Sequence, residues 1–452
     1  MHIIIIGGGD VGRELAQNLS CKHQNVVVIE NSQEAAEKLG QDLDIAVING
    51  NGTNLDILNK ANIKSAGMLI AVTGSDEANI IACMIAKTFG VSFTVARVRD
   101  PESAGSIDVD ARGLIHKQVG IDMIISPEKT VAQEISKMIH FPEAAEVDYF
   151  ARGRVMLAAT MVREEAKITD KALMELSLPK GCIVVGIKKP DGVFILPSGR
   201  DKISVNDKVY ILGKSEVIRE ASQLLHHQSA KVNRVVIVGG GIIGFNLASI
   251  LESDKQASFI TKIIEKDADR VEELNRKLSK TIVLQGNGTE ISYFNEEEIA
   301  EADILVAATE NDLTNIVVSV MGQKLGVPKI ITELTRIGYA PVYDIVGVQE
   351  AINPHLITAA QILRYTRVED VVSLSLLKEE TAEVMEVSLP SSASVVGKSL
   401  AEANFPKGLL IGTIVRNEEV IIPHGSTVLK AGDQLIIFAI SCSRLDRFFG
   451  SR

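Results

Sequence analysis

The sequence predicts an α/β protein with two tandem doubly wound parallel-sheet domains, each followed by a small α+β domain. Three observations predict this fold class. The chain of 452 residues repeats itself about halfway along its length. Each repeat opens with a run of Ile and Val that leads into glycines and then into helical spacing, which is typical of a strand, a turn and a helix. Each repeat ends with short β-rich runs joined by turn residues.

The internal repeat determines the order of the domains. The segments that recur in one order are IIIIGGGDVG (3–12) as VVIVGGGIIG (235–244), GNGT (50–53) at 286–289, AVTGSDEANI (71–80) as AATENDLTNI (307–316), GIDMIISP (120–127) as GVQEAINP (347–354), and PKG (179–181) at 406–408. The predicted domains are 1–140 and 232–367 for the larger type, and 141–225 and 368–452 for the smaller type. The first half is longer, with its extra residues expected near 100–112, and the polar stretch 222–233 is predicted to link the halves.

The composition excludes several classes of protein. Abundant Ile and Val, with aromatics at 4% and no Trp, suit parallel strands that helices cover on both faces. A formal charge of −11 disfavours nucleic acid and anionic lipid as partners. The four cysteines include no CxxC pair, so neither a zinc knuckle nor a disulfide framework is indicated. The apolar runs are too short or too polar for a signal peptide or a membrane span.

The first repeat carries a glycine motif between a strand and a helix. Gly7, Gly9 and Gly12 form the pattern GxGxxG after the run at residues 2–6. Such glycines allow a tight turn and a close approach of the backbone to a pyrophosphate, whose charge the helix N-terminus stabilises. Glu30 ends the next strand-like run and can accept hydrogen bonds from a ribose diol. This arrangement predicts a Rossmann-like nucleotide site.

The second repeat carries the same arrangement, with GxGxxG at 239–244 and Glu265 at the end of the next run. One such motif is weak support, whereas two copies in the same context are strong support. The alternative is that the turns remain in a fold that has lost its ligand, and this alternative has more weight for the second copy. No Arg closely follows Glu30, which favours NAD(H) or an adenine nucleotide over NADP(H).

Further candidate residues lie where the later strands end. Thr73 and Gly74 follow one predicted strand at the carboxyl edge of the sheet, where ligands of open α/β sheets bind. Arg97 ends the next strand and could reach a phosphate, although a surface ion pair is an equal alternative. The matching position in the second half is Glu333, and an acid there would repel a phosphate. The second site is therefore predicted to bind more weakly, to bind differently or to be empty.

The sequence shows no catalytic constellation and no metal site. None of the eight histidines recurs in both larger domains at the same place. Tyr210 and Lys214 have the spacing of a Tyr-x-x-x-Lys pair, but they lie in a strand-like run and not on the helix that such a pair needs, so we interpret the spacing as chance. Asp108 and Asp110 are expected in a solvated loop. We predict that the protein is not an enzyme; the rival is an NAD-dependent oxidoreductase, which a substrate-dependent change in NADH absorbance would identify.

The chain also resembles a known family. The segments IIIIGGGDVGRELAQNL, VIEN, GNGTN, AVTGSDEANI and VARVRDPE, in a duplicated chain with small C-terminal domains, resemble the TrkA family of cytosolic regulatory subunits of Trk potassium uptake, which are built from RCK (KTN) domains. The resemblance implies binding of NAD(H), and of ATP or ADP at the same sites, without turnover. It also implies a homotetramer bound to a membrane potassium channel subunit of the Trk type, in the cytoplasm at the inner face of the cell membrane and without insertion into it. Regulation of a different ion transporter is an open alternative.

The resemblance and the repeated motifs together give the expected nucleotide contacts. In the first half they are Gly7, Gly8, Gly9, Asp10, Val11, Gly12, Glu30, Asn51, Thr73, Gly74 and Arg97. In the second half they are Gly239, Gly240, Gly241, Ile242, Ile243, Gly244, Glu265, Asn287 and Thr309.

Overall fold

The fold is known from a computed structural model of the chain. It describes residues 1–21, 24–99, 121–164, 166, 169, 171–224, 232–254, 258–290, 299–348, 350–365, 371–376, 382–406 and 408–440. The chain divides into two compact units, one of Met1–Ser136 with Val232–Leu363 and one of Lys137–Lys231 with Arg364–Arg452. Each unit therefore combines corresponding parts of the two sequence repeats. The four domain boundaries that the repeat suggests remain predictions.

The first unit contains a parallel sheet built from the first repeat, with the strand order β3-β2-β1-β4-β5-β6. Its strands are β1 (His2–Ile6), β2 (Asn25–Glu30), β3 (Ala46–Asn49), β4 (Met68–Ala71), β5 (Phe93–Arg97) and β6 (Met123–Ile125). Its helices are α1 (Asp10–Cys21), α2 (Gln33–Asp42), α3 (Leu55–Lys60), α4 (Asp76–Thr88) and α6 (Pro127–His140). All five pairings between neighbouring strands are parallel.

Strand β1 shows why this sheet is covered on both faces. Ile3 and Ile5 belong to one apolar core and Ile4 to the other, because successive side chains of a strand point to opposite faces. Residues of α1 pack into the first core and residues of α4 into the second. The run of consecutive isoleucines is thus explained by burial on both sides, and the predicted doubly wound architecture is confirmed.

The second repeat builds a matching parallel sheet in the same unit, with the order β14-β13-β12-β15-β16-β17. Its strands are β12 (Arg234–Val238), β13 (Ile260–Glu265), β14 (Ile282–Gln285), β15 (Ile304–Ala307), β16 (Lys329–Glu333) and β17 (Glu350–Ile352). Its helices are α8 (Ile242–Ser253), α9 (Ala268–Lys277), α11 (Asp312–Lys324), α12 (Ala340–Val346) and α13 (Pro354–Tyr365). The equal strand orders confirm that the sequence repeat is a structural repeat.

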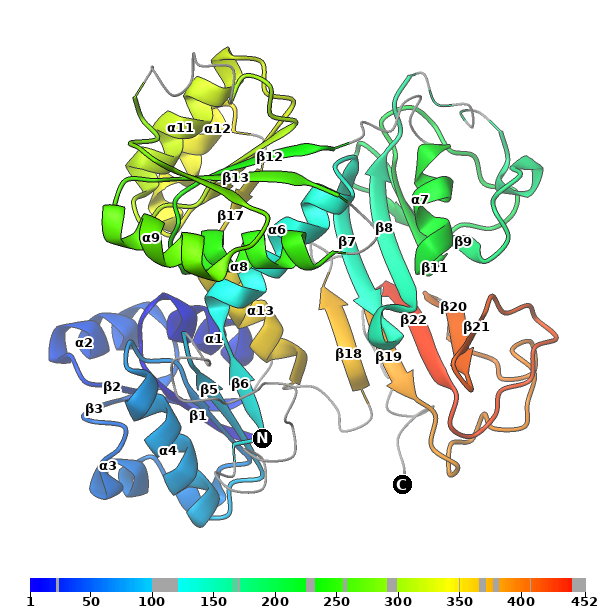
Figure 1. The fold of residues 1–452 in the computed structure, drawn as a ribbon. Coiled ribbons are helices and arrows are strands. Elements are labelled where there is room, and N and C mark those ends of the chain that lie inside the picture. The colour runs from blue at the N-terminus through cyan, green and yellow to red at the C-terminus, as the bar shows by residue number, and fades with distance from the viewer. Residues whose placement is uncertain are drawn as a thin grey trace. The chain divides into compact units, whose positions relative to one another are not determined.

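Helix α13 of the second repeat packs against the first sheet. Ala359, Ile362 and Leu363 of α13 are buried in the same core as Ile3 and Ile5 of β1. Figure 1 shows α13 beside α1, although the two helices are far apart in the sequence. A hydrogen bond from Thr130 of α6 to Gln361 of α13 further joins the two repeats. The first sheet therefore depends on a helix from the other half of the chain for one part of its core.

The second unit contains two antiparallel sheets, with the orders β10-β9-β11-β8-β7 and β18-β19-β22-β20-β21. The first consists of β7 (Ala144–Phe150), β8 (Val155–Met161), β9 (Cys182–Lys188), β10 (Phe194–Ile195) and β11 (Lys208–Lys214), followed by α7 (Ser215–Gln223). The second consists of β18 (Val371–Leu376), β19 (Ala382–Ser388), β20 (Leu409–Arg416), β21 (Glu419–Ile421) and β22 (Gln434–Ile440). Short 3-10 helices lie at Ile63–Ser65, Ala151–Gly153, Leu173–Glu175 and Ile337–Tyr339.

The two small sheets share one apolar core inside this unit. The rings of Phe194 and Tyr210 in the first sheet pack against the ring of Phe438 in the second, with centroids 5.6 and 5.9 Å from it. Both sheets carry the predicted hairpin, β9–β10 and β20–β21. Tyr210 and Lys214 lie on strand β11, which confirms that their spacing is not a catalytic pair on a helix.

The structure corrects one predicted loop, and another lies outside the described residues. The predicted linker at 222–233 begins too early, because Ser222 is buried in the last turn of α7, whose amphipathic pattern continues through it. The extra segment expected near 100–112, with Asp108 and Asp110, lies outside the described residues. Within the described part of the chain, no helix is both long enough and apolar enough to span a membrane.

Candidate functional site

A cavity of about 510 Å³ lies over the carboxyl ends of β1, β2, β4 and β5 in the first half. Most of the predicted nucleotide contacts of that half line it. They are Gly7, Gly9, Asp10, Val11, Glu30, Asn51, Thr73, Gly74 and Arg97. The position is the one at which open α/β sheets bind ligands, because the loops that follow parallel strands gather at that edge. The structure thus brings the predicted residues together around one cavity.

The glycine turn has the close contacts that the motif predicts. Gly7 has φ of 104° and donates a hydrogen bond from its N–H to the carbonyl of Ile29 at 2.9 Å. A Cβ atom on Gly12 would lie 1.9 Å from the carbonyl oxygen of Gly7, so only glycine fits at this first turn of α1. Gly8 and Gly12 do not line the cavity: Gly8 lies against the side chain of Glu30, and Gly12 lies against the carbonyl of Gly7. A Cβ atom on Gly9 would meet no other atom within 4 Å.

The carboxylate of Glu30 is held at the edge of the cavity by backbone donors. Its Oε2 accepts from the N–H of Gly8 at 2.6 Å, and its Oε1 accepts from the N–H of Ser32 at 2.8 Å. Each carboxylate oxygen can accept more than one hydrogen bond, so both can also receive the hydroxyls of a ribose. The same residue therefore fixes the glycine turn and presents acceptors to a ligand.

Asn79 on α4 aligns two of the predicted contacts. Its buried amide accepts from the N–H and the hydroxyl of Thr73 at 2.9 and 2.7 Å. It also donates to the carbonyls of Thr73 and Arg97 at 3.2 and 2.9 Å. Asn51 has a similar local role, because its side chain accepts from the N–H and the hydroxyl of Thr53. The side chain of Asn79 thus joins the loops after β4 and β5.

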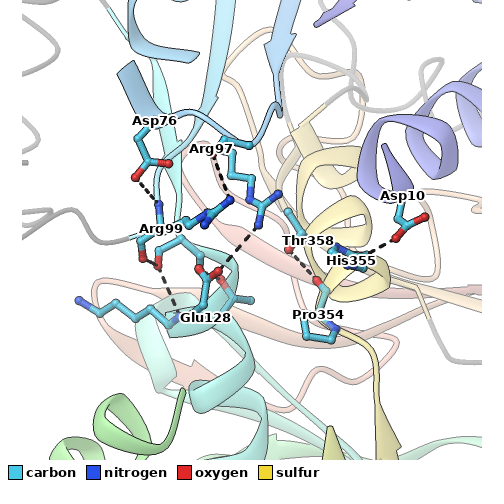
Figure 2. A network of polar contacts seen from close by, with 12 residues as sticks. Asp10, Asp76, Arg97, Arg99, Glu128, Pro354, His355 and Thr358 are labelled. Carbon is cyan, nitrogen blue, oxygen red and sulfur yellow. Dashed lines mark hydrogen bonds and ion pairs between the residues drawn. The ribbon is translucent and has the colours of Figure 1, made fainter. Parts of the chain in front are cut away.

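Arg97 lines the cavity and also faces a carboxylate. Its guanidinium lies 3.8 Å from Oε1 of Glu128 on α6, and burial lowers the pKa of the arginine although Glu128 opposes the shift. Burial likewise raises the pKa of Glu128. Figure 2 shows this pair together with Arg99, whose N–H donates to Asp76 and whose guanidinium donates to the carbonyl of Gly74. Arg97 therefore lines the cavity and faces Glu128 at the same time, and its contact with a phosphate remains a prediction.

The cavity is completed by a residue of the second repeat, His355 at the start of α13. Its Nε2 lies 3.6 Å from Oδ2 of Asp10, and Figure 2 shows the two side chains facing each other. Burial lowers the pKa of His355, Asp10 opposes that shift and Arg97 adds to it. Asn353 fixes the backbone at the start of α13, because its side-chain oxygen accepts from the backbone N–H of His355 at 2.8 Å.

The second half repeats the turn with the same contacts. Gly239 has φ of 110°, and a Cβ on Gly244 would lie 2.0 Å from its carbonyl oxygen. Glu265 accepts from the N–H of Gly240 at 2.7 Å, and Asn315 joins Thr309 to the carbonyl of Glu333 as Asn79 joins Thr73 to Arg97. The other predicted contacts follow the same pattern. Gly241 precedes α8, Ile242 and Ile243 lie in its first turn, and Asn287 accepts from Thr289.

Two features distinguish the second turn from the first. Arg270 on α9 donates to the carbonyl of Gly240 at 2.7 Å, so a guanidinium rests on this turn. Glu333 is buried at the end of β16, and burial, with the negative charges of Asp312, Glu128 and Glu310, raises the pKa of Glu333 to about 8. The expected repulsion of a phosphate by Glu333 therefore holds only above that pH. Below it, the second half lacks the cation that Arg97 supplies and has a neutral carboxyl in its place.

Sequence reasoning missed His355, Asn79 and Asn315. A signal for the asparagines was present, since each is the next-to-last residue of its repeated segment, AVTGSDEANI and AATENDLTNI. For His355 the repeat matches Pro127-Glu128 with Pro354-His355, but nothing local indicates which sheet receives α13. The described residues include no group of three or more His, Cys, Asp or Glu side chains placed to hold a metal ion.

Comparisons with known proteins agree with this architecture. The TrkA-N domain model matches residues 3–127 and 235–354, and the TrkA-C domain model matches 157–226 and 384–442. The GsuK RCK domain has a similar fold, with a TM-score of 0.62, 18% identity, and coverage of 97% of this chain and 92% of that one. The GsuK channel bound to NAD gives the same TM-score at 19% identity, over 97% of this chain and 77% of the channel.

Two curated relatives are similar over their full length. The Trk system potassium uptake protein TrkA homolog 1 of Methanosarcina mazei is 34% identical, over 99% of this chain and 100% of its own. The Trk system potassium uptake protein TrkA of Vibrio alginolyticus is 32% identical, over 98% of this chain and 96% of its own. Both sets of motifs, the duplicated fold and these matches lead to one assignment. The chain belongs to the TrkA family of potassium uptake proteins, with TrkA-N and TrkA-C domains in tandem.

Proposed function

We propose that this protein is a cytosolic regulatory subunit that binds NAD(H), ATP or ADP and thereby gates a Trk-type membrane potassium channel. The observation that carries the proposal is the cavity of the first half, in which a glycine turn, Glu30 and Arg97 surround space for a nucleotide. Family membership supplies the transport context. Binding energy at this site is then available to shift a conformational equilibrium, provided that a ligand prefers one state.

The charges favour the first half as the tighter site for phosphate-bearing ligands. Its cavity is lined by Arg97, whereas the matching Glu333 is neutral or negative. A charge-assisted hydrogen bond contributes about 1.5–3 kcal/mol, which is roughly tenfold to a hundredfold in affinity. Glu30→Gln and Glu265→Gln in the full chain separate the two sites, because each removes one carboxylate and keeps the shape of the side chain. We expect Glu30→Gln to weaken the tighter binding event, measured by calorimetry, and Glu265→Gln to weaken the other.

We further propose a homotetramer. Corresponding helices of the two halves expose apolar side chains, Ile81 and Met84 on α4 and Leu313 and Val317 on α11, and of these Ile81 and Val317 occupy matching places in the repeat. Apolar groups that recur on one face of both halves favour association with further copies, and closed symmetric assemblies are the common outcome. Light scattering at micromolar concentration tests this proposal. A strict monomer would contradict it.

Potassium flux tests the regulatory role directly. Vesicles that contain a Trk-type channel subunit and this protein are assayed with NADH, ATP and ADP in turn, and we expect flux to change severalfold with nucleotide, as a coupling of about 1–3 kcal/mol predicts. The variant Glu30→Gln should reduce the response, while Glu37→Gln, at an exposed position on α2, should not. If nucleotides bind and flux ignores all three, the regulatory role is refuted. A substrate-dependent loss of NADH absorbance would instead favour an oxidoreductase.

A further inference from the structure

We propose that His355, from the second half of the chain, contacts the terminal phosphates of a nucleoside di- or triphosphate bound in the first half. This inference rests on the proposed nucleotide site and adds a residue that distinguishes ligands there. His355 lines the cavity of the first half although it lies on α13 of the second repeat. The first site is therefore formed by both halves of the chain.

The order of the strands sets the direction in which a ligand lies. Glu30 ends β2, the glycine turn follows β1, and Arg97 ends β5 on the far side of β4. A ribose held by Glu30 places the first phosphates of a nucleotide at the N-terminus of α1, where backbone donors and the helix dipole stabilise negative charge. Further phosphates then extend over β4 toward Arg97.

His355 lies between the N-terminus of α1 and Arg97. It lies 3.6 Å from Asp10 in the first turn of α1, and Arg97 is close enough to influence its pKa. Among the described residues, none forms a hydrogen bond with its buried Nδ1. A terminal phosphate between Arg97 and His355 would receive a hydrogen bond from each, and the negative phosphate would favour the charged form of the imidazole. AMP ends before this point. NADH continues with a ribose and a neutral ring, so it gives His355 no terminal phosphate.

The placement of His355 also connects the ligand to the second sheet. Its backbone N–H donates to the side-chain oxygen of Asn353, which directly follows β17 and whose amide also donates to the carbonyl of Thr335 at 3.2 Å. The hydroxyl of Thr358 donates to the carbonyl of Pro354 at 2.7 Å and closes the first turn of α13. A phosphate that contacts His355 therefore contacts a residue that the second half holds in place. ADP and ATP would then bind residues of both halves, whereas AMP would bind only residues of the first half.

Calorimetry on the full-length protein tests this proposal with ATP, AMP and NADH. In His355→Phe the ring size is kept and both hydrogen-bonding nitrogens are lost. We expect ATP to bind about tenfold to a hundredfold more weakly at the tighter site, with AMP and NADH changed less than threefold, because one charge-assisted hydrogen bond is removed from ATP alone. His355→Gln keeps a donor and should lose less. His424→Phe, at an exposed position in the second unit, is the matched control.

The possible results separate the two proposals. Unchanged ATP affinity in both His355 variants, with nucleotide binding intact, overturns the role of His355 and leaves the proposed function standing. An equal loss for ATP and AMP also overturns it, since His355 would then shape the cavity rather than contact terminal phosphates. If the unaltered protein binds neither ATP nor NADH, the proposed function fails and this inference fails with it.

Discussion

Replacing Glu333 by Gln should change how the stability of the protein depends on pH. Glu333 is buried at the end of β16, and burial together with Asp312, Glu128 and Glu310 raises its pKa from 4.5 to about 8. In the unfolded chain this carboxyl loses its proton near its ordinary pKa, whereas in the folded protein it keeps the proton up to about pH 8. The folded state therefore binds more protons between these values, and its stability falls as the pH rises through them.

The size of the effect follows from the shift. One pKa unit corresponds to about 1.4 kcal/mol, so a shift from 4.5 to about 8 sets an upper limit of about 5 kcal/mol. Local relaxation and water reduce this value, and we expect about 2–4 kcal/mol. Gln has nearly the same shape and does not titrate, so Glu333→Gln should be more stable than the original protein above pH 8 by that amount. Below pH 4.5 the two proteins should differ little.

The measurement is chemical denaturation of both proteins from pH 5 to pH 9, with the first unit followed by a probe attached within it. The difference in unfolding free energy between them should grow through this range and then level off. Glu37→Gln removes an exposed carboxylate from α2, and its unfolding free energy should depend on pH as that of the original protein does. If the unfolding free energy of Glu333→Gln also has the same pH dependence as that of the original protein, Glu333 is charged in the folded protein and the argument from burial is wrong.

Two further predictions concern the first site. Gly12→Ala should lower stability by about 1–3 kcal/mol and abolish the tighter nucleotide binding, because its Cβ would lie 1.9 Å from the carbonyl of Gly7. Gly9→Ala has no atom within 4 Å of its Cβ and should leave the melting temperature unchanged. An equal drop in the melting temperatures of the two variants would refute the steric reason. Asn79→Ala should cost roughly 1–3 kcal/mol and weaken binding at the first site, because it leaves buried groups of Thr73 and Arg97 without their partner. Asn315→Ala should lower stability by a similar amount and leave nucleotide binding at the first site unchanged. Loss of binding at the first site in that variant would contradict the independence of the two sites.

Much of the fold could be predicted because the informative features are local and occur twice. The run of isoleucines before Gly7 indicates a buried parallel strand, and the spacing from Gly7 to Gly12 indicates the turn and the helix that follow. The position of Glu30 beside the glycine turn could be predicted because Glu30 ends a strand, and its hydrogen bond from the N–H of Gly8 agrees with that position. These features depend only on residues close together in the chain.

The rest of the site depends on tertiary contacts that no local pattern reports. His355 reaches the first cavity because α13 packs its apolar face on the first sheet, and the same face could equally have packed on its own sheet. Glu333 was expected to repel phosphate through its charge, but the neighbouring acids and burial, which make it neutral below about pH 8, arise only in the folded protein. Nucleotide contact by the predicted residues remains a prediction.

The packing of α13 on the first sheet also affects how the protein is made. Ile3 and Ile5 leave the ribosome before Ile362 and Leu363, which complete their core and follow about 350 residues later. At roughly 5–20 residues per second this is a delay of about 20–70 s. During that time the part of this apolar face that α13 covers is exposed on the nascent first sheet. In a crowded polysome the α13 of a neighbouring chain could cover it instead, so exchange of this helix between copies is the misassembly to which this architecture is most exposed.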